Sequence, residues 1–469
     1  MVRASVVVEK AGIPTASIVA TGFLGQAKAT AKSLGMANLG LAEYPGIIMN
    51  HSQEELRKNV ETVLVPNIIK VLTKPTENAV KVNELRATDV IFEGTLDEVN
   101  EFFLQKQWSD GLPIIPPTVE RVQAFLKFTD HQPDEVLGVL APENRQATIW
   151  NVAVNGVMAG CRPEYMPVLI AVVEAIAEPD FHLRDAGATP GWEPLIILNG
   201  PIAKELDFNY ESGILRAGRQ ANTSIGRFIR LYMRNVAGLR IAPGSMDKGS
   251  IGLGLNVVVA ENEDAVSELG WESFSSQRGF DRSDNVVTVQ SALSTTIPIY
   301  SAGDTALDHM DTLVEVFGGT CAFWSHTAVR KGKYFPLLII SPGVAKVIAR
   351  DGWTKREIQQ HLFEHTKVSV RALQKHAWQI GFSEYDLYAL VAKGVVSPAY
   401  AESDDPDRLV PAFIKSEWIG IVIGGDPGRN QSKGFVQNHD QAPPISKKII
   451  LPANWQNLVG KVKKSHEAH

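Results

Sequence analysis

The stretch from Ala147 to Glu178 constrains the fold more than any other part of the sequence. It reads ATIWNVAVNGVMAGCRPEYMPVLIAVVEAIAE, and most of its residues are apolar. Its first half predicts a helix that ends at Ala159-Gly160. Its second half predicts a helix over 168–177, which must end before Pro179 because proline lacks the N–H group. Cys161 falls in the break, and we expect the rest of the chain to be organised around this helix pair.

Cys161 is the first candidate for chemistry. Pro163 and Pro167 are tolerated in a first helical turn, so the second helix is expected to begin at one of them. Unpaired N–H groups at that helix end, together with the neighbouring Arg162, favour the nucleophilic thiolate. Asn155, Glu164 and Tyr165 add polar groups to the same segment. The alternative is that Cys161 only fills space in the core, as many free cysteines do.

Composition limits the classes of function. The chain has 469 residues, which predicts more than one domain, and a net charge of -6, which gives no reason to expect nucleic acid or an anionic membrane as a partner. Its two cysteines cannot form a disulfide framework or a CxxC zinc site, which favours a reducing compartment and therefore the cytoplasm. No signal peptide and no membrane-spanning apolar run is visible.

The N-terminal residues alternate between helix and strand patterns. A helix ending near Gly12, a strand over 15–21, a helix over 26–34 and a strand over 39–43 precede a long helix. Ser52 and Glu55 form a capping-box pattern at its start. Strands separated by helices predict a small parallel sheet, although the pattern asks for one more strand before the first helix.

The same region carries a resemblance to a known family. The run VVVEKAGIPTASIVATGFLGQAKATAKSLGMANLGLAEYPG resembles the segment that follows the Sec/Cys-Gly-Ser-Cys motif in the UGSC family of selenoproteins and their cysteine homologues. The later stretches DGLPIIPPT, VMAGCRPEYMPV and ANTSIGRFIRLYMRNVAG resemble a larger domain that occurs fused to that unit or alongside it. The resemblance implies redox chemistry.

The motif that names the family would lie just upstream of Met1. Three explanations are open: a second polypeptide supplies it, the reading frame was opened after a UGA codon taken as a stop, or this branch does without it.

We expect an α/β fold, with a small parallel-sheet unit followed by a larger mixed α/β or α+β region. The predicted domains are residues 1–86, residues 92–330, which contain the Cys161 and arginine motifs, and residues 331–469, which pack on the central domain. The loop Trp108 to Pro117 contains Asp110 and several prolines, and it is either a pocket wall or a stiff connection.

A helix predicted over 222–235 carries a stripe of arginines. The preferred N-cap residues Asn222, Thr223 and Ser224 follow a Gly-rich approach that contains Arg219. Arg227, Arg230 and Arg234 share one face of this helix, so they could form an anion site with its N-terminus. The alternative is that these arginines are solvated or paired with acidic residues from elsewhere.

Other motifs are weaker. Cys321 precedes His326 but reads as part of a buried turn, and the Gly-rich loop Lys248–Gly254 does not match a nucleotide-binding order. The loop Gly424–Asn430 follows a strand and is a candidate for touching substrate. His361 and His365 share a helix face without the HExxH order, so no metal site is predicted.

Two kinds of function follow. The first is an enzyme or enzyme subunit, an oxidoreductase or a lyase, that uses Cys161 as a thiol on a small anionic metabolite. Its candidate residues are Cys161, Glu164 and Asn155 for catalysis and Arg162, Tyr165, Arg219, Asn222, Ser224, Arg227, Arg230 and Asp110 for binding. The second is a non-catalytic scaffold for a partner that carries the Sec/Cys-Gly-Ser-Cys motif. A further alternative is a lyase or hydratase that uses Glu164 and a metal. We expect the chain to form a homo- or hetero-oligomer. The sequence does not predict a cofactor.

Overall fold

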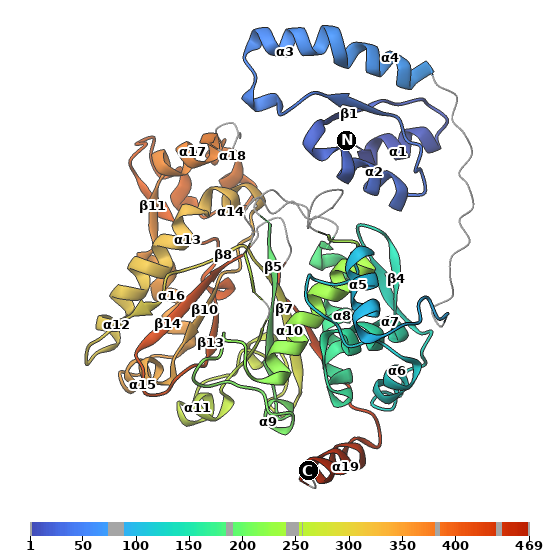
Figure 1. Cartoon of the computed structure of the whole chain (residues 1–469). Coiled ribbons are helices and arrows are strands. Elements are labelled where there is room, and N and C mark those ends of the chain that lie inside the picture. The colour runs from blue at the N-terminus through green and yellow to red at the C-terminus, as the bar shows by residue number, and fades with distance from the viewer. Residues whose placement is uncertain are drawn as a thin grey trace.

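The computed structural model describes residues 2–73, 89–183, 191–240, 253–255, 257–379, 385–437 and 443–467. The first range forms the N-terminal unit, and the others form a larger region with two mixed sheets (Figure 1).

The N-terminal unit is a small α/β layer structure. Strands β1 (Ser17–Ala20) and β2 (Leu41–Tyr44) pair in parallel, as the sequence predicted, with Ser17 opposite Leu41. Helices α1 and α2 lie on one side of the strands, and the α3–α4 helix lies on the other (Figure 1). Ser52 caps α3 in the expected capping box with Glu55. The remaining elements are α1 (Val2–Lys10), η1 (Thr21–Phe23), α2 (Leu24–Ser33), η2 (Ile48–Asn50), α3 (Gln53–Asn59), the π-helical turn η3 (Val60–Leu64) and α4 (Val65–Thr73).

The first half of the larger region contains the two apolar helices. Its elements are α5 (Leu96–Gln105), α6 (Val119–Leu126), β3 (Val136–Leu140), β4 (Arg145–Thr148), α7 (Ile149–Ala159), η4 (Pro163–Tyr165), α8 (Met166–Ala177), η5 (Pro179–Phe181), β5 (Glu193–Asn199), α9 (Ile202–Glu205), α10 (Gln220–Tyr232), the π-helical turn η7 (Met233–Ala237), β6 (Val258–Ala260), α11 (Glu263–Glu268), η8 (Ser276–Arg278) and β7 (Val286–Ala292).

The second half continues with short helices around the second sheet. Its elements are β8 (Ser294–Thr295), β9 (Ile299–Tyr300), α12 (Ala306–Leu313), the π-helical turn η9 (Val314–Gly318), α13 (Gly319–Phe323), α14 (Ser325–Lys331), β10 (Leu337–Ile340), α15 (Pro342–Arg350), α16 (Lys355–His365), β11 (Lys367–Ser369), α17 (Val370–Gln379), α18 (Leu387–Ala392), η10 (Pro398–Ala401), β12 (Leu409–Pro411), η11 (Ser416–Trp418), β13 (Gly420–Ile423), β14 (Gln431–Val436), β15 (Ile445–Lys448) and α19 (Trp455–Glu467).

The two large sheets each mix parallel and antiparallel pairs. One has the order β15-β7-β5-β6, in which only β5 and β6 are parallel. The other has the order β13-β10-β14-β8, in which β10 and β13 are parallel, and β9 also pairs with β14. The short ladders β3-β4 and β11-β12 are antiparallel.

Alternation along the strands shows that these sheets pack face to face. Leu195 and Ile197 of β5 belong to one buried cluster together with Leu337 and Ile339 of β10. The intervening residues of β5 and β10 belong to two other clusters, on the outer faces of the sheets. Because neighbouring strand residues point to opposite faces, the region has four layers, helices outside and two sheets inside.

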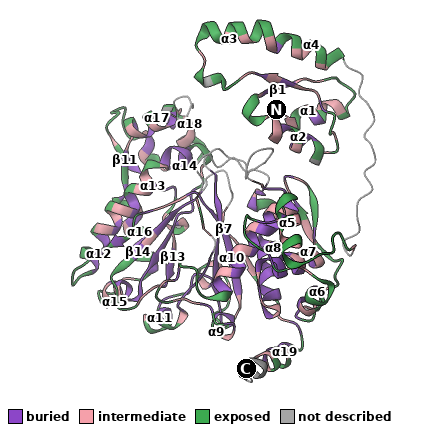
Figure 2. Cartoon of the chain, viewed as in Figure 1, coloured by how far each residue is buried: buried purple, intermediate pink, exposed green. Residues whose placement is uncertain are grey.

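The apolar helix pair covers the outer face of the first sheet. Helix α8 contacts β7 and β15, and α10 contacts both α7 and β6. Burial is concentrated in α7, α8 and the central strands, and every residue of β5, β6, β7 and β10 is buried (Figure 2). The second cluster runs from Ala265 to Val436 and so includes residues on both sides of position 330, while Trp455 packs in the first cluster. The domain boundaries stay predictions.

Candidate functional site

The turn that carries Cys161 forms as the sequence predicted. Helix α7 ends at Gly160, which adopts a left-handed conformation (φ 80°), and the Cys161 N–H donates to the Gly156 carbonyl at 3.0 Å. Only glycine takes this conformation without steric cost. Pro163 opens a 3₁₀ turn that leads into α8, so the cysteine lies between the two helices.

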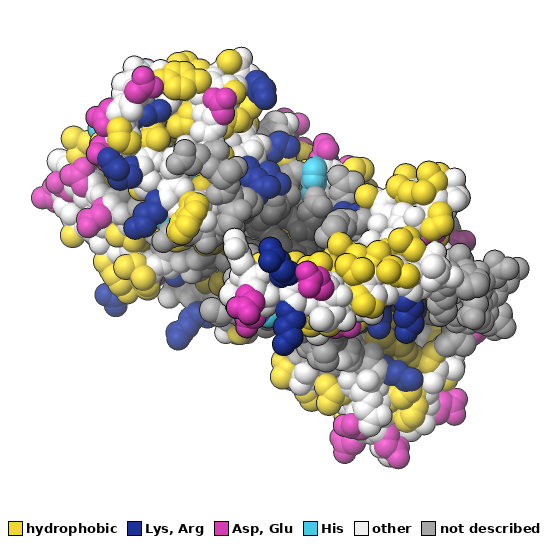
Figure 3. Space-filling view, turned by 90° about the horizontal axis from the view of Figure 1, so that it is seen from above, with side chains coloured by type: hydrophobic (Ala, Val, Ile, Leu, Met, Phe, Trp, Pro, Cys, Tyr) yellow, Lys and Arg dark blue, Asp and Glu magenta, His cyan; other side chains and the backbone are white. Residues whose placement is uncertain are grey.

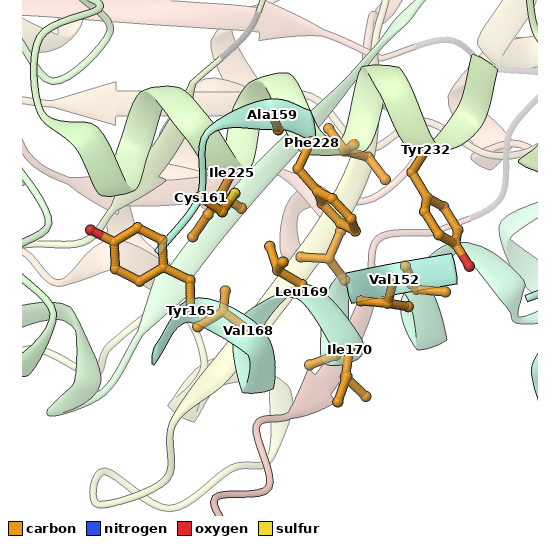
Figure 4. Close-up of a cluster of buried hydrophobic side chains, with 14 of the residues drawn as sticks. Val152, Ala159, Cys161, Tyr165, Val168, Leu169, Ile170, Ile225, Phe228 and Tyr232 are labelled. Atoms are coloured by element: carbon orange, nitrogen blue, oxygen red, sulfur yellow. The ribbon is translucent and has the colours of Figure 1, made fainter. Parts of the chain in front are cut away.

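The surroundings of Cys161 disfavour the expected thiolate. The side chain lies among Tyr165, Val168 and Ile225 in the apolar core (Figure 4). Burial raises the pKa of the Cys161 thiol to about 12, and neither a hydrogen bond from Ser224 nor the charge of Arg227 offsets this. Desolvation penalises the charged form more than the helix end and the nearby cations stabilise it. This environment therefore favours the protonated thiol at neutral pH.

Cys321 does not differ from Cys161 in this respect. It is buried in helix α13 and not in a turn, and burial raises the pKa of its thiol to about 12 as well. Its neighbour His326 donates from Nδ1 to the Phe323 carbonyl (2.8 Å). The sequence predicted that Cys161 is more reactive than Cys321, but burial raises the pKa of both thiols alike.

The polar residues near Cys161 mostly serve the packing of helices. Asn155 donates to the Asn151 carbonyl (2.9 Å), and its side-chain oxygen accepts from Asn235 (2.9 Å). Glu164 is buried, with Arg162 Nη1 at 3.9 Å from its carboxylate. The Tyr165 ring is buried, and burial raises the pKa of its hydroxyl. The structure thus brings Glu164 and Tyr165 close to Cys161 in the fold, while Asn155 is committed to Asn235.

The arginine stripe of α10 is neutralised by other segments. Arg227 binds both oxygens of Asp110 (2.9 and 2.8 Å) and the Pro113 carbonyl (2.9 Å). Arg230 lies 3.2 Å from the buried carboxylate of Glu193. Burial acts to raise the pKa of Asp110, but the Arg227 hydrogen bonds and charge outweigh it, so that this pKa is lowered. The expected anion site on this stripe is therefore filled by the protein's own carboxylates.

Two further arginines are also engaged. Arg234 donates to the Gln107 carbonyl at 2.7 Å, and Arg219 binds Asp207 through two hydrogen bonds of 2.8 and 2.7 Å. Asp110 and its loop, predicted as a possible pocket wall, are thus an anchor for Arg227. Charge pairing over more than 100 residues of sequence cannot be read from a local pattern.

The start of α10 also differs from the prediction. The helix begins at Gln220 with Arg219 as its N-cap, and no side chain caps it. Asn222 instead uses its amide to bind Asn209 (2.8 and 3.0 Å) and the Val258 carbonyl (2.8 Å). Ser224 is buried beside Cys161. Both residues act inside the fold because the helix starts earlier than the cap signals indicate.

Sequence reasoning missed a buried ion pair between the two halves of the larger region. Glu261 follows β6 and accepts from Lys355 Nζ (2.7 Å), Asn199 Nδ2 (2.8 Å), the Phe274 N–H (2.6 Å) and the Ile423 N–H (3.1 Å). Both side chains are almost completely buried. Lys355 stands in the first turn of a helix, where a lysine usually faces water, so no local signal marks it.

The structure describes the remaining candidate motifs only in part. In the loop after β13, the Gly425 N–H donates to the Tyr210 carbonyl at 3.1 Å. His361 and His365 stack with ring centroids 4.0 Å apart. Across the described ranges, no group of three or more His, Cys, Asp and Glu side chains could hold a metal ion. The Gly-rich loop Lys248–Gly254 lies mostly outside the described residues.

Comparison with known proteins agrees with the resemblance seen in the sequence. The model of the UGSC family matches residues 1–74, which are the N-terminal unit. Neither the curated proteins nor the solved structures contain a match to this chain. In the part of the chain that the structure describes, no helix is both long and apolar enough to cross a membrane.

Proposed function

We propose that this chain is the scaffold subunit of a redox assembly, and that its N-terminal unit receives a β-strand from a polypeptide carrying a Sec/Cys-Gly-Ser-Cys motif. The observation that carries the proposal is the open outer edge of β1. The motif, implied by the resemblance to the UGSC family, would supply the reactive group, and this chain would hold it in place.

The hydrogen-bond pattern defines this edge. The Ser17 N–H donates to the Gly40 carbonyl at 2.9 Å, so the N–H group of Ser17 points toward β2. Successive residues of a strand point their N–H groups in opposite directions, so Ile18 and Ala20 direct theirs away from β2. Within the described ranges these two N–H groups have no partner. An unpaired edge of this kind accepts an added strand.

The outer edge of β2 is different, because a side chain of α4 occupies part of it. Asn67 of α4 donates from its side chain to the Glu43 carbonyl at 3.2 Å, and α4 packs against β2. The two edges of this sheet are therefore not equivalent. A strand added to the unit would pair with β1, which would make β1 the central strand of the sheet.

The unit also buries little apolar surface. Its two buried clusters are small, one around Val6 and the other around Tyr44. The outer face of η3 and α4 leaves four aliphatic side chains exposed, namely Val60, Val65, Ile69 and Leu72. The view from above shows hydrophobic side chains along this helix (Figure 3). Such surface is usually covered in an assembly, which supports a partner-binding role.

The geometry around Cys161 favours the scaffold over the thiol enzyme. A thiolate is disfavoured there, and the arginines proposed to bind substrate are paired with Asp110, Glu193 and Asp207. Chemistry at Cys161 would require the core around it to open first. The scaffold needs no such opening, since strand addition would use the backbone groups at the edge of β1.

A proline at Ala20 tests the proposal. Ala20 has φ −65°, the angle that proline requires, and its N–H makes no bond inside the unit. The Ala20→Pro variant should therefore keep the fold while it removes a donor that the added strand needs. Loss of one backbone hydrogen bond, with the ring obstructing the incoming strand, should weaken binding by at least ~fivefold.

The assay uses the full chain and a polypeptide that contains the motif, encoded next to this chain, with affinity measured by calorimetry. Ala20→Ser keeps the N–H and is the matched control. Amide hydrogen exchange should slow at Ile18 and Ala20 when the polypeptide binds. Equal binding by both variants, or protection confined to other segments, would refute the scaffold role. A motif found in the same reading frame would mean that the strand is supplied within one longer chain.

A further inference from the structure

A cavity of about 610 Å³ that is wide open to solvent is lined by residues of η8, η11 and β15, and its lining includes neither Cys161 nor any residue of the N-terminal unit. The residues that matter in its lining are Arg278, Phe280, Phe335, Trp418, Lys447 and Asp180. Its size is within the range of sites that hold small organic molecules. No part of the proposed scaffold function uses it.

Arg278 is the dominant polar group of the cavity. Its Nε donates to Ser446 Oγ (2.8 Å), and its Nη2 donates to the Pro444 carbonyl (2.5 Å). Its guanidinium also lies over the Phe274 ring, 5.4 Å from the centroid. Ser446 is itself bonded to Thr288 (2.8 Å), which holds the arginine in place. Among the described residues no hydrogen bond engages Nη1, while the bonds of Nε and Nη2 fix the guanidinium.

No carboxylate pairs with Arg278 among the residues that the structure describes. Burial lowers the pKa of this guanidinium to about 10, with no acidic neighbour acting against it. Nearby, Lys447 is bonded to Glu178, so these two lining charges compensate each other. A half-buried arginine without an anionic partner is costly, and an arriving anion relieves that cost.

Aromatic rings line the cavity beside this cation. The Phe335 and Trp418 rings lie 4.7 Å apart at an interplanar angle of 32°, and Lys415 Nζ lies 4.9 Å from the Trp418 ring centroid. Phe280 lies in the lining as well. Flat apolar walls of this kind favour a planar aromatic group over a flexible or strongly hydrated one.

We propose that this cavity binds a small aromatic carboxylate, whose carboxylate bonds Arg278 Nη1 and whose ring packs against Phe335 and Trp418. A phosphate or sulfate alone would leave the aromatic walls unused. A neutral aromatic would leave the arginine unpaired. Asp180, also in the lining, disfavours ligands with more than one negative charge.

The test measures binding of 1-naphthoate to the full chain by the fluorescence of the ligand, and of benzoate by saturation-transfer NMR. The neutral 1-naphthamide should bind the unchanged protein at least about tenfold more weakly, because it cannot form the charge-assisted bond. Arg278→Met should weaken naphthoate binding to a similar extent. Equal affinity of the acid and its amide for the unchanged protein would overturn the proposal.

Two further variants test whether the ligand binds at this cavity. Arg282→Met removes an exposed arginine that bonds the Trp271 carbonyl (3.1 Å) outside the lining, and it should leave the affinity unchanged within about twofold. Trp418→Leu removes an aromatic wall and should weaken naphthoate more than benzoate, since the larger ring uses more of it. Equal losses of naphthoate affinity in Arg278→Met and Arg282→Met would show a general charge attraction and would refute the site. Unchanged naphthoate affinity in Trp418→Leu would place the ligand elsewhere and would also refute the site.

Discussion

Alkylation of Cys161 is the most direct test of the interpretation of this thiol. With a pKa of about 12, the folded protein carries ~3 × 10⁻⁵ of this thiol as thiolate at pH 7.5. An exposed cysteine with a pKa of ~8.5 carries ~0.1 at the same pH. Since only the thiolate attacks iodoacetamide, Cys161 should react ~3,000-fold more slowly than a free cysteine, even before restricted access is considered.

The assay follows the alkylation of both cysteines by peptide mass spectrometry between pH 6 and 11, below the temperature of unfolding. The Cys161 rate should rise about tenfold per pH unit over this range, without a plateau below pH 11. In guanidinium chloride the same cysteine should titrate near ~8.5, which serves as the internal control. The Cys161→Ser variant confirms the assignment of the modified peptide.

A native Cys161 whose alkylation rate reaches its plateau between pH 7 and 9 would refute the reasoning. That result would mean that the helix end and Arg162 outweigh desolvation, as the sequence alone suggested. The thiol enzyme would then be favoured over the scaffold. Cys321 is measured in the same samples, and its slower or equal reaction is expected because it is completely buried.

Three further outcomes are expected. Lys355→Met leaves Glu261 buried without its cation and should lower the free energy of unfolding by about 3–5 kcal/mol in urea titrations. The control Lys346→Met breaks an exposed pair and should change the free energy of unfolding by less than ~1 kcal/mol. Similar losses in the two variants would contradict the burial argument. Arg227→Gln should cost about 1–3 kcal/mol by the same titration because Asp110 and two carbonyls lose a half-buried donor, while the exposed Arg219→Gln should be nearly neutral. A fragment of residues 1–86 should show no cooperative thermal transition as a monomer by circular dichroism, since its sheet has an open edge and a small core; a sharp monomeric transition would sink this expectation.

Stability should also fall at alkaline pH for a reason that the two thiols share. Their folded pKa values lie above the unfolded value of ~8.5, so the folded state keeps protons that the unfolded state releases. The contribution is complete below pH ~8.5 and is lost as the pH rises from there toward 12, at about 1.4 kcal/mol per pH unit for each thiol. Cys161→Ala should flatten this dependence in urea titrations at pH 8 to 11, and an unchanged slope would contradict it.

Much of the local structure was predictable from short stretches of sequence. The Ser52 capping box and the helix break at Gly160 both formed where the residues indicated. Each of these features is decided by a few neighbouring residues, through a side chain that satisfies a nearby N–H or a glycine that allows a left-handed turn. The parallel pairing of β1 and β2 followed from the helix between them.

The properties of the candidate site depend on residues far apart in the chain. Arg227 meets Asp110 across 117 positions, and Lys355 meets Glu261 across 94. Cys161 has a raised pKa because helices α7, α8 and α10 together exclude water from it. Local sequence shows which groups are present and how each element begins and ends. Which charges become neighbours, and which groups lose their water, depends on how the layers pack, because electrostatic and solvation energies depend on distance in space and not along the chain.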